Sequence, residues 1–328
     1  MQIFKSLIGN ENIKNTLGSA IINSEFLHAY IIEGPRGSGR HTIARLASAA
    51  IMCKDKNSLP CGICNTCHKI LNDNCADVRF FDAFKVDDIR KIKETLYEST
   101  TECEYKVYVF NDCEKMNVAS QNALLLVLEE PPKNVIFFLI CNDSSALLET
   151  IRSRAQILRT MPLENDVIFD YVKNNSRVQI DEKRLKEIII SSRGSLGYTL
   201  DMLDESKADS LFKERERARV FTENILNNDT ECARLISSMF QTSRDKLKEL
   251  FSMSLNVLRD LAIVKKSRNA SLCFYTSQND ALATSSRHSI KKIITAVEAI
   301  ENALYDLNVN ASVPCALTNI MTQIKKGS

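Results

Sequence analysis

The chain has 328 residues, with 43 Lys and Arg against 41 Asp and Glu, so its formal net charge is only +2. A chain of this length can form two or three domains, each with its own core. The balance of charges argues against a protein whose main task is to coat nucleic acid, because such proteins bind through a strongly basic face. No run of about 18 apolar residues occurs, and residues 1–14 lack the apolar core of a signal peptide. We therefore expect a cytoplasmic protein without a membrane partner.

A glycine-rich loop follows the first strand-like segment. Residues 29–33 form a short apolar run typical of a buried strand, residues 34–41 read GPRGSGRH, and residues 42–52 have the pattern of a helix. The same arrangement of strand, loop and helix holds nucleotide phosphates in the pattern G-x-x-x-x-G-K-[ST]. In that pattern the backbone N–H groups hold the phosphates, the Lys contacts the outer ones and the hydroxyl binds Mg²⁺.

The loop departs from the phosphate-binding pattern at two of its positions. Gly34 and Gly39 match, but Arg40 stands where the Lys is expected and His41 stands where the hydroxyl is expected. Thr42 supplies a hydroxyl one position later. Arg keeps a positive charge, but its planar fork does not replace the compact ammonium of Lys.

Four of the eleven cysteines lie close together, at Cys53, Cys61, Cys64 and Cys67. Four thiolates on one short segment favour a closed tetrahedral Zn²⁺ site, in which the metal is structural because no position remains open for water. The alternative is a set of free or redox-active thiols. The two C-x-x-C spacings favour zinc.

Further segments of the first half alternate between helix and strand. The pattern predicts helices over 87–99 and 119–130, the second ended by two prolines, and buried strands over 106–110 and 135–140. Continuous apolar strands between helices are typical of a parallel sheet that is covered on both faces.

Beyond residue 163 the strand signal ends. Residues 166–203 are expected to form a small group of helices with a turn at Gly194 and Gly197, and amphipathic helices are expected over 211–226, 245–264 and 290–307. The predicted divisions are an α/β domain over 1–163 with a metal module at 53–67, a small helical domain over 164–208 and a helical domain over 209–328.

Several motifs together resemble the bacterial clamp-loader subunits of the AAA+ class. They are the glycine loop, the four-Cys segment, NALLLVLEEPP at 122–132, and IRSR at 151–154, which stands where that family has its S-R-C motif. The resemblance extends over essentially the whole chain, including residues 259–261 and 308–312. It implies a P-loop AAA+ α/β domain over 1–163, a small helical lid domain over 164–208 and an all-α C-terminal collar domain over 209–328.

The chain lacks several parts that an ATP-hydrolysing member of the family carries. Asn111 and Asp112 occupy the positions of its Asp-Glu pair, and no phosphate-sensing Arg lies near Gly197. Asn142 matches the polar sensor position of the family. Because phosphoryl transfer depends on positioning and electrostatics, we expect no intrinsic ATPase activity. Any residual phosphate binding would involve the following residues of the loop: Gly34, Gly37, Gly39, Arg40 and Thr42.

One reactive part of the family pattern is present. Arg154 matches the Arg of the S-R-C motif, which the family presents to the nucleotide of a neighbouring subunit, and Ser153 would position the turn. Ala155 replaces the Cys of that motif. The alternative is that Arg154 is a solvated residue near a helix C-terminus, where a cation is favoured.

The resemblance implies a non-catalytic subunit of the replicative clamp loader in the DNA polymerase III holoenzyme. It would organise the ring and provide an arginine finger to a neighbouring ATPase subunit. Its partners would be the gamma/tau and delta subunits, with the sliding clamp and primed DNA reached through the assembled complex. The alternative is an ATP-hydrolysing motor subunit of the gamma/tau type or a stand-alone AAA+ ATPase. A nucleic-acid-binding zinc ribbon is disfavoured because the four-Cys segment has few basic residues around it and no aromatics.

Overall fold

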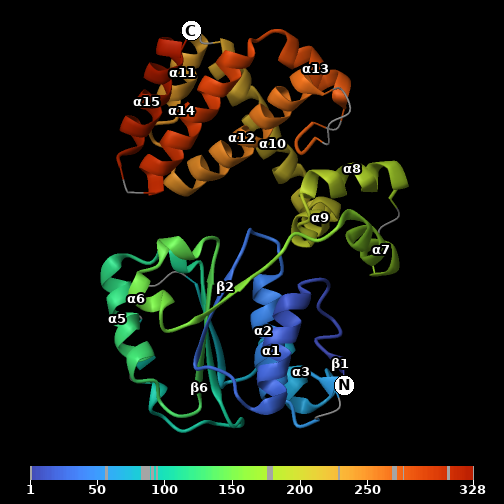
Figure 1. Cartoon of the computed structure of the whole chain (residues 1–328), viewed down its shortest axis with the longest axis vertical. Helices are drawn as coiled ribbons and strands as arrows, with labels where there is room; N and C mark the ends of the chain where they lie inside the picture. The colour runs from blue at the N-terminus through green and yellow to red at the C-terminus, as the bar shows by residue number, and fades with distance from the viewer. Residues whose placement is uncertain are drawn as a thin grey trace. The chain divides into compact units, whose positions relative to one another are not determined.

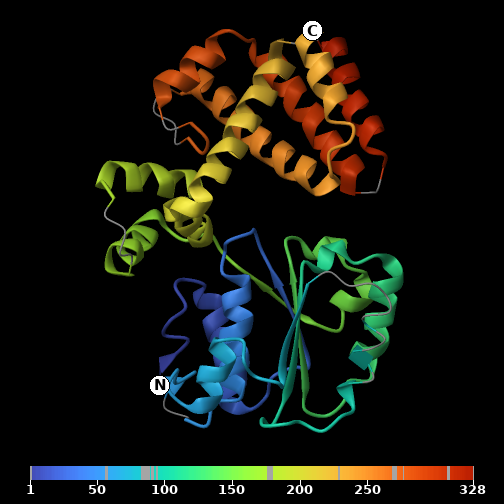
Figure 2. The ribbon, with the colours of Figure 1, turned by 180° about the vertical axis from the view of Figure 1, so that it is seen from behind.

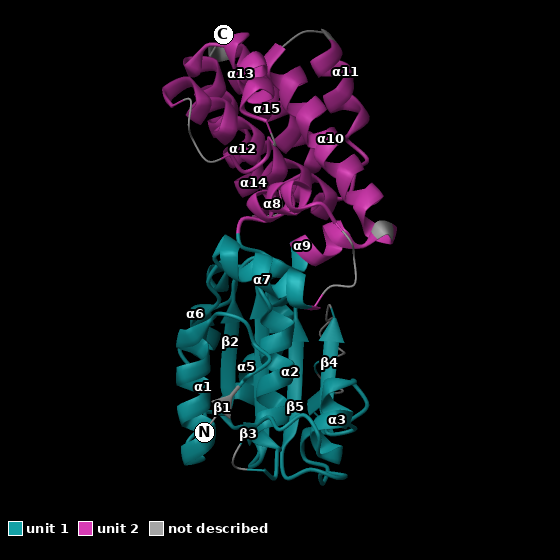
Figure 3. Cartoon of the chain, turned by 90° about the vertical axis from the view of Figure 1, so that its right-hand side faces the viewer, with its two compact units in different colours: residues 1–174, 194–198 teal, residues 175–193, 199–328 magenta. Residues whose placement is uncertain are grey.

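The computed structural model describes residues 2–55, 58–82, 89, 92–93, 95–175, 180–227, 230–267, 272–275, 277–308 and 311–327. The chain divides into two compact units (Figure 3). Unit 1 comprises residues 1–174 and 194–198, and unit 2 comprises residues 175–193 and 199–328.

The elements of unit 1 alternate along the chain. Its strands are β1 (Gln2–Ile3), β2 (Ala29–Glu33), β3 (Ser58–Leu59), β4 (Val78–Asp82), β5 (Lys106–Asn111), β6 (Val135–Cys141) and β7 (Gln156–Arg159). Its helices are α1 (Glu11–Asn23), α2 (Arg40–Ile51), α3 (Asn65–Leu71), α5 (Val118–Glu129), α6 (Glu149–Arg152) and most of α7 (Asn165–Asn175).

Five of these strands form one parallel sheet in the order β4-β5-β6-β2-β7. β2 pairs with β6 on one side and with β7 on the other. Helices α1, α2 and α3 lie on one face of the sheet and α5 and α6 on the other, as the two opposite views agree (Figures 1 and 2). The predicted parallel α/β fold, covered on both faces, is confirmed.

Successive residues of the central strands point to opposite faces, as the pleat requires. In β2, Tyr30 and Ile32 pack in the core under α1 and α2, whereas Ala29 and Ile31 pack in the core under α5 and α6. All of β5 and β6 is buried. Two apolar layers therefore hold the sheet, which explains why these strands read as continuous apolar runs.

Two details of the sequence expectation need correction. Gly197 lies inside the first turn of α9 (Leu196–Leu203) and not in the turn before it. Strands β4 and β7 carry no apolar run long enough to be recognised, since each is an edge strand of the sheet and is partly exposed. The helix predicted over 87–99 lies partly outside the described residues.

Unit 2 is helical over its described residues. Its helices are α8 (Glu182–Ser192), most of α9, α10 (Glu205–Asn227), α11 (Thr230–Ser238), α12 (Arg244–Lys266), α13 (Gln278–Ser286), α14 (Ile290–Asn308) and α15 (Val313–Gly327). One core joins α10, α11, α12, α14 and α15, so the predicted all-α C-terminal region is confirmed. The expected boundary between residues 208 and 209 falls within α10. None of the helices among the described residues is long and apolar enough to cross a membrane.

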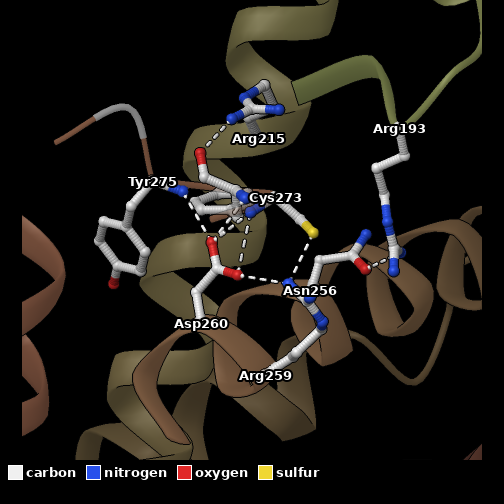
Figure 4. Close-up of polar contacts among 8 residues, drawn as sticks. Arg193, Arg215, Asn256, Arg259, Asp260, Cys273 and Tyr275 are labelled. Carbon is white, nitrogen blue, oxygen red and sulfur yellow. Dashed lines mark hydrogen bonds and ion pairs between the residues drawn. The ribbon is translucent and has the colours of Figure 1, made fainter. Parts of the chain in front are cut away.

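A buried carboxylate ties a loop of unit 2 to α12 (Figure 4). Asp260 is fully buried and accepts hydrogen bonds from the backbone N–H groups of Cys273, Phe274 and Tyr275 at 2.7–3.1 Å. Arg259 forms an ion pair with the same carboxylate at 3.1 Å. Paired and fully bonded, this charge can remain inside the core. Residues 259–261, which the resemblance singled out, therefore have a structural role.

We expect Asp260→Asn to destabilise unit 2 by about 3 kcal/mol, because an amide accepts fewer and weaker bonds from these N–H groups and its own N–H₂ is left unpaired. Urea unfolding followed by circular dichroism measures the loss. Asp209→Asn, an exposed change on α10, is the matched control and should leave the unfolding midpoint unchanged. Equal midpoints for the two variants would contradict the assigned role.

Candidate functional site

The glycine loop lies at the carboxyl end of β2, an inner strand of the sheet between β6 and β7. The chain leaves β2 toward β4 on one side of the sheet and later returns to place β7 on the other side of β2. In parallel α/β sheets ligands bind at such a reversal of strand order, outside the carboxyl ends of the strands. The topology thus places residues 34–39 where a phosphate-binding loop is expected.

Contacts with the end of β7 fix the base of the loop. The backbone N–H of Thr160 donates to the carbonyl of Glu33 at 2.8 Å, and the hydroxyls of Thr160 and Ser38 are hydrogen-bonded at 2.8 Å. A Cβ atom added to Gly34 would lie 1.7 Å from the Thr160 hydroxyl oxygen. Gly34 is therefore required at this position.

The tip of the loop packs directly against residues 194–198 of the same unit. The N–H of Gly197 donates to the carbonyl of Gly37 at 3.0 Å. A Cβ atom on Gly197 would lie 2.8 Å from Gly37 Cα, and one on Gly37 would lie 2.3 Å from Ser195 Oγ. Two glycines thus allow a backbone contact that any side chain would open. An Arg at position 197 is incompatible with this contact.

Arg40 begins α2 and points its guanidinium into the protein. It is only 4% exposed, and its Nη1 has no hydrogen-bond partner among the described residues. Burial lowers the pKa of Arg40, and the negative charges of Glu114 and Asp112 partly offset this effect. A buried donor without a partner is costly, so this position suits an anion or a water molecule.

The end of β5 carries the two residues that replace the acidic pair of the family. Asn111 donates from Nδ2 to Asp82 Oδ1 at 2.5 Å. Asp112 has a left-handed backbone, with φ of 49°, and forms an ion pair with Lys115 at 2.9 Å. Asn111 therefore offers no carboxylate, and the carboxylate of Asp112 is in an exposed ion pair.

Sequence reasoning missed Glu114, two residues further along. Asn142 at the end of β6 donates from Nδ2 to Glu114 Oε1, while Glu114 Oε2 is buried without a partner among the described residues. The expected polar sensor Asn142 thus contacts a carboxylate of this chain. A signal was present, because Glu114 is an acidic residue only three positions after the end of the buried strand β5.

The residues at the loop fit an anion better than a magnesium nucleotide. Arg40 Nη1 is an unpaired donor for an anion, and the N-terminus of α2 has no side-chain cap, which leaves backbone N–H groups for a phosphate. At the metal positions, His41 has a lowered pKa, chiefly from burial and from the charge of Arg40, and is therefore neutral. Thr42 is exposed. Asn111 is a poor ligand for a hard cation.

Arg154 lies just after the short helix α6. Its Nη2 forms an ion pair with Glu129 Oε1 at 2.9 Å, its Nη1 donates to the carbonyl of Thr150 at 3.1 Å, and its side chain is 37% exposed. Ser153 ends α6 and donates from Oγ to the same carbonyl at 3.1 Å. The turn thus presents Arg154 at the surface, beside the first Glu of the EEPP sequence.

The four predicted cysteine ligands come together. The sulfur atoms of Cys53, Cys61, Cys64 and Cys67 all lie within 4.8 Å of one another, and those of Cys61 and Cys67 are 3.9 Å apart. Tetrahedral zinc with Zn–S bonds of about 2.3 Å separates its sulfurs by about 3.8 Å. The cluster could therefore hold a metal ion such as zinc.

Local hydrogen bonds prepare these sulfurs for a cation. The N–H of Cys64 donates to Cys61 Sγ at 3.3 Å and lowers the pKa of Cys61 to about 7. Burial raises the pKa of Cys53 and of Cys67. Four adjacent thiolates need a positive charge at their centre, which a divalent metal supplies. The thiol of Cys67 contacts the carbonyl of Ala49 in α2 at 3.8 Å, so the module is attached to that helix.

The contact between Gly197 and Gly37 predicts the effect of one methyl group. We expect Gly197→Ala to destabilise unit 1 by about 1–3 kcal/mol, because the added Cβ collides with backbone atoms that cannot turn aside. The amide at position 197 should also exchange its hydrogen faster, because its bond to the Gly37 carbonyl is lost. Hydrogen exchange with mass spectrometry measures this change.

Ser210→Ala, on the exposed face of α10, is the control, because it also introduces an alanine into a helix but lies in unit 2, whereas the glycine loop belongs to unit 1. It should leave exchange in residues 34–39 unchanged. Unaltered exchange at position 197 in Gly197→Ala would show that the two glycines are not in direct contact in solution.

Comparisons with known proteins agree with these motifs. Residues 9–164 match the family model described as DNA polymerase III, delta subunit. The chain is 32% identical over 212 residues to the DNA polymerase III subunit gamma of Buchnera aphidicola, which covers 62% of this chain and 58% of that relative. It is 31% identical over 212 residues to the subunit tau of Bacillus subtilis, covering 62% of this chain and 38% of that relative.

A further relative is the DNA polymerase III subunit tau of Escherichia coli, which is 26% identical over 258 residues, covering 76% of this chain and 40% of that relative. The chain thus spans 58% or less of the length of these three curated relatives. A gamma subunit-related protein of DNA polymerase III from Thermotoga maritima aligns with a TM-score of 0.43 at 17% identity, over 95% of this chain and 99% of that one.

The RuvB Holliday junction branch migration motor of Thermotoga maritima aligns with a TM-score of 0.45 at 17% identity, over 89% of this chain and 86% of that one. The residues that match the family model include the glycine loop, the four-Cys segment and the turn that carries Arg154. Over these residues the chain is similar to subunits of DNA polymerase III.

Proposed function

We propose that the chain is a delta-prime-type subunit of a DNA polymerase III clamp loader, one that does not hydrolyse ATP itself. The observation that carries this proposal is the end of β5, where Asn111 is bonded to Asp82 and Asp112 is paired with Lys115. A loop of ATPase descent with an amide at the metal position, and with only a shorter carboxylate on a left-handed backbone at the position that polarises water, has lost the pair on which hydrolysis depends. Hydrolysis of a bound nucleotide would therefore be negligible.

The contact between Gly37 and Gly197 supports the same proposal. A phosphate-sensing Arg at position 197 would require residues 194–198 to move away from the loop. The chain has instead adopted a close backbone contact that holds the loop in one conformation. Such a rigid member suits an assembly in which other subunits change shape with ATP.

Arg154 would then act on the nucleotide of a neighbouring gamma/tau subunit. An arginine supplied in trans stabilises the charge that develops on the transferred phosphoryl group. In the isolated chain Glu129 holds Arg154 by an ion pair between side chains that are each more than one-third exposed. Such exposed pairs are weak, so Arg154 could exchange Glu129 for a phosphate at little cost.

The second candidate is an ATP-hydrolysing subunit of the gamma/tau type, which the curated relatives favour by their names. In that case Glu114, with its unpaired buried oxygen, would replace the missing carboxylate. A titration of the chain with Mg-ATP, together with a turnover assay on the same sample, separates the two. The proposal requires no turnover by the chain alone. Hydrolysis that is lost in Glu114→Gln would establish the second candidate.

In a loader reconstituted with gamma/tau and delta subunits, we expect Arg154→Ala to reduce hydrolysis at the adjacent nucleotide site by about a thousandfold. The other sites are silenced by substitution of their loop lysines, so that only one site is measured. Arg154→Lys should restore little activity, because an ammonium lacks the planar fork. ATP turnover on primed DNA with the sliding clamp gives the rate.

Lys133→Ala is the matched control, since Lys133 is an exposed cation that lies near the other end of the EEPP sequence. It should leave turnover unchanged. If Arg154→Ala assembles normally and hydrolyses ATP at the unaltered rate, Arg154 is a surface residue without a role in catalysis.

We further propose that the four-Cys cluster holds structural Zn²⁺. All four positions would be filled by protein thiolates, which leaves no site for a reacting water. The metal would hold residues 53–67 in place of a hydrophobic core of their own. Zinc would then affect the binding of the clamp, of DNA and of the neighbouring subunits only indirectly, because it is needed for unit 1 to fold.

Metal analysis of the purified chain should give about one zinc per molecule. Cys64→Ser should lower the zinc content and the melting temperature, because one thiolate is lost from a closed site. Cys315→Ser, an exposed cysteine of α15, should change neither. A full complement of zinc in Cys64→Ser would exclude this ligand set.

A further inference from the structure

Two cysteines outside the four-Cys cluster lie in contact at the amino ends of the strands of the sheet, whereas the glycine loop lies at a carboxyl end. Cys75 precedes β4 and Cys103 precedes β5, and these strands are parallel neighbours, so both residues lie at the amino ends of the strands. Their sulfur atoms are 3.7 Å apart. Cys75 is 6% exposed and Cys103 is half-buried.

The backbone around the two thiols is held by an unusually dense set of polar contacts. The Asp77 carboxylate accepts hydrogen bonds from the N–H groups of Thr101, Glu102 and Cys103 at 2.8–2.9 Å. Although burial opposes it, this set of bonds lowers the pKa of Asp77, which therefore stays ionised. The N–H of Val107 donates to the Asp77 carbonyl at 2.8 Å. Residues 75–77 and 101–103 are thus fixed against each other.

A second link joins the same loop to α3. Glu102 forms an ion pair with Lys69 of α3 and accepts a hydrogen bond from the N–H of Ala76. The loop that carries Cys103 is thereby bonded to residues before Cys75 in the chain, through Lys69, and to residues after it, through Ala76 and Asp77. The two sulfurs need to approach by about 1.7 Å to reach the length of a disulfide bond.

We propose that Cys75 and Cys103 are a dithiol that is oxidised reversibly to an intramolecular disulfide by hydroperoxides. The thiolate of one cysteine attacks a peroxide oxygen, which forms a sulfenic acid and releases water or an alcohol. The second thiol attacks the sulfenic sulfur, the S–S bond forms and a water leaves. The two sulfurs together lose two electrons and two protons, and the peroxide gains them. A small dithiol then reduces the disulfide back to the two thiols through a mixed disulfide.

The half-buried Cys103 is the thiol that a peroxide can reach. Burial, together with the neighbouring Cys75, raises the pKa of Cys103 to about 12, so its thiolate is scarce at neutral pH and the oxidation is slow. The disulfide therefore forms under sustained oxidation and not in brief exposure. It would close the segment 75–103, which contains the edge strand β4, and would restrict the unfolded chain.

The test uses the full, zinc-loaded chain treated with hydrogen peroxide and then with N-ethylmaleimide. Peptide mass spectrometry should find a peptide pair linked through Cys75 and Cys103, which dithiothreitol separates. The oxidised protein should melt several degrees higher than the reduced one, by about the shift expected of a closed loop of this size. Cys113→Ser, a change at a buried cysteine elsewhere in unit 1, should still form the link.

Cys103→Ser should abolish the linked peptide and the rise in melting temperature. Cys75→Ala is the second variant, should Cys103→Ser be poorly folded, and the peptide map of the unaltered chain decides the matter without either. Alkylation of both cysteines after peroxide treatment, oxidation of Cys103 to sulfinic acid without a link, or a link from either residue to the four-Cys cluster would each overturn the proposal.

Discussion

The pairing of β2 with strands on both of its sides is the constraint on which the rest of unit 1 depends. Because β2 pairs with β6 on one side and β7 on the other, its residues 29–32 are buried. Its loop emerges where the order of the strands reverses. The same pairing brings Thr160, at the end of β7, against the base of that loop. The location of the glycine loop is thus fixed by backbone hydrogen bonds of the sheet, independently of whether any nucleotide binds.

The sequence alone was sufficient wherever one strong signal decided the structure. The buried strands β5 and β6 were predictable because both of their faces are apolar, and α5 because two prolines follow it. Strands β4 and β7 were not predictable, because they lie at the edges of the sheet. Residues 79–81 of β4, for example, mix exposed and half-buried side chains, so that this strand resembles a loop in sequence. Helix α1 was not predicted, although Ile13, Leu17 and Ile21 recur at helical spacing and are buried in the structure.

The site divides in the same way between local and long-range features. Cys53, Cys61, Cys64 and Cys67 could be assigned from spacing, because all four lie on one short segment. The contact of Gly37 with Gly197 and the pairing of Asn142 with Glu114 join residues far apart in the chain. Spacing carries no information on such contacts. The missing acidic pair was visible in the sequence, but only the structure gives partners for its replacements, Asp82 for Asn111 and Lys115 for Asp112.

Helix α2 connects the two chemical features of unit 1. It begins at Arg40, next to the glycine loop, and ends at Ile51, two residues before the first cysteine of the cluster. A helix of this length spans about 18 Å, and nearly all of it is buried. Its C-terminal turn contacts Cys67 through the carbonyl of Ala49. If the cluster holds the proposed Zn²⁺, loss of that metal would loosen the last turn of α2. The fraying would then spread along the helix toward the loop, so that the two ends open as one cooperative unit.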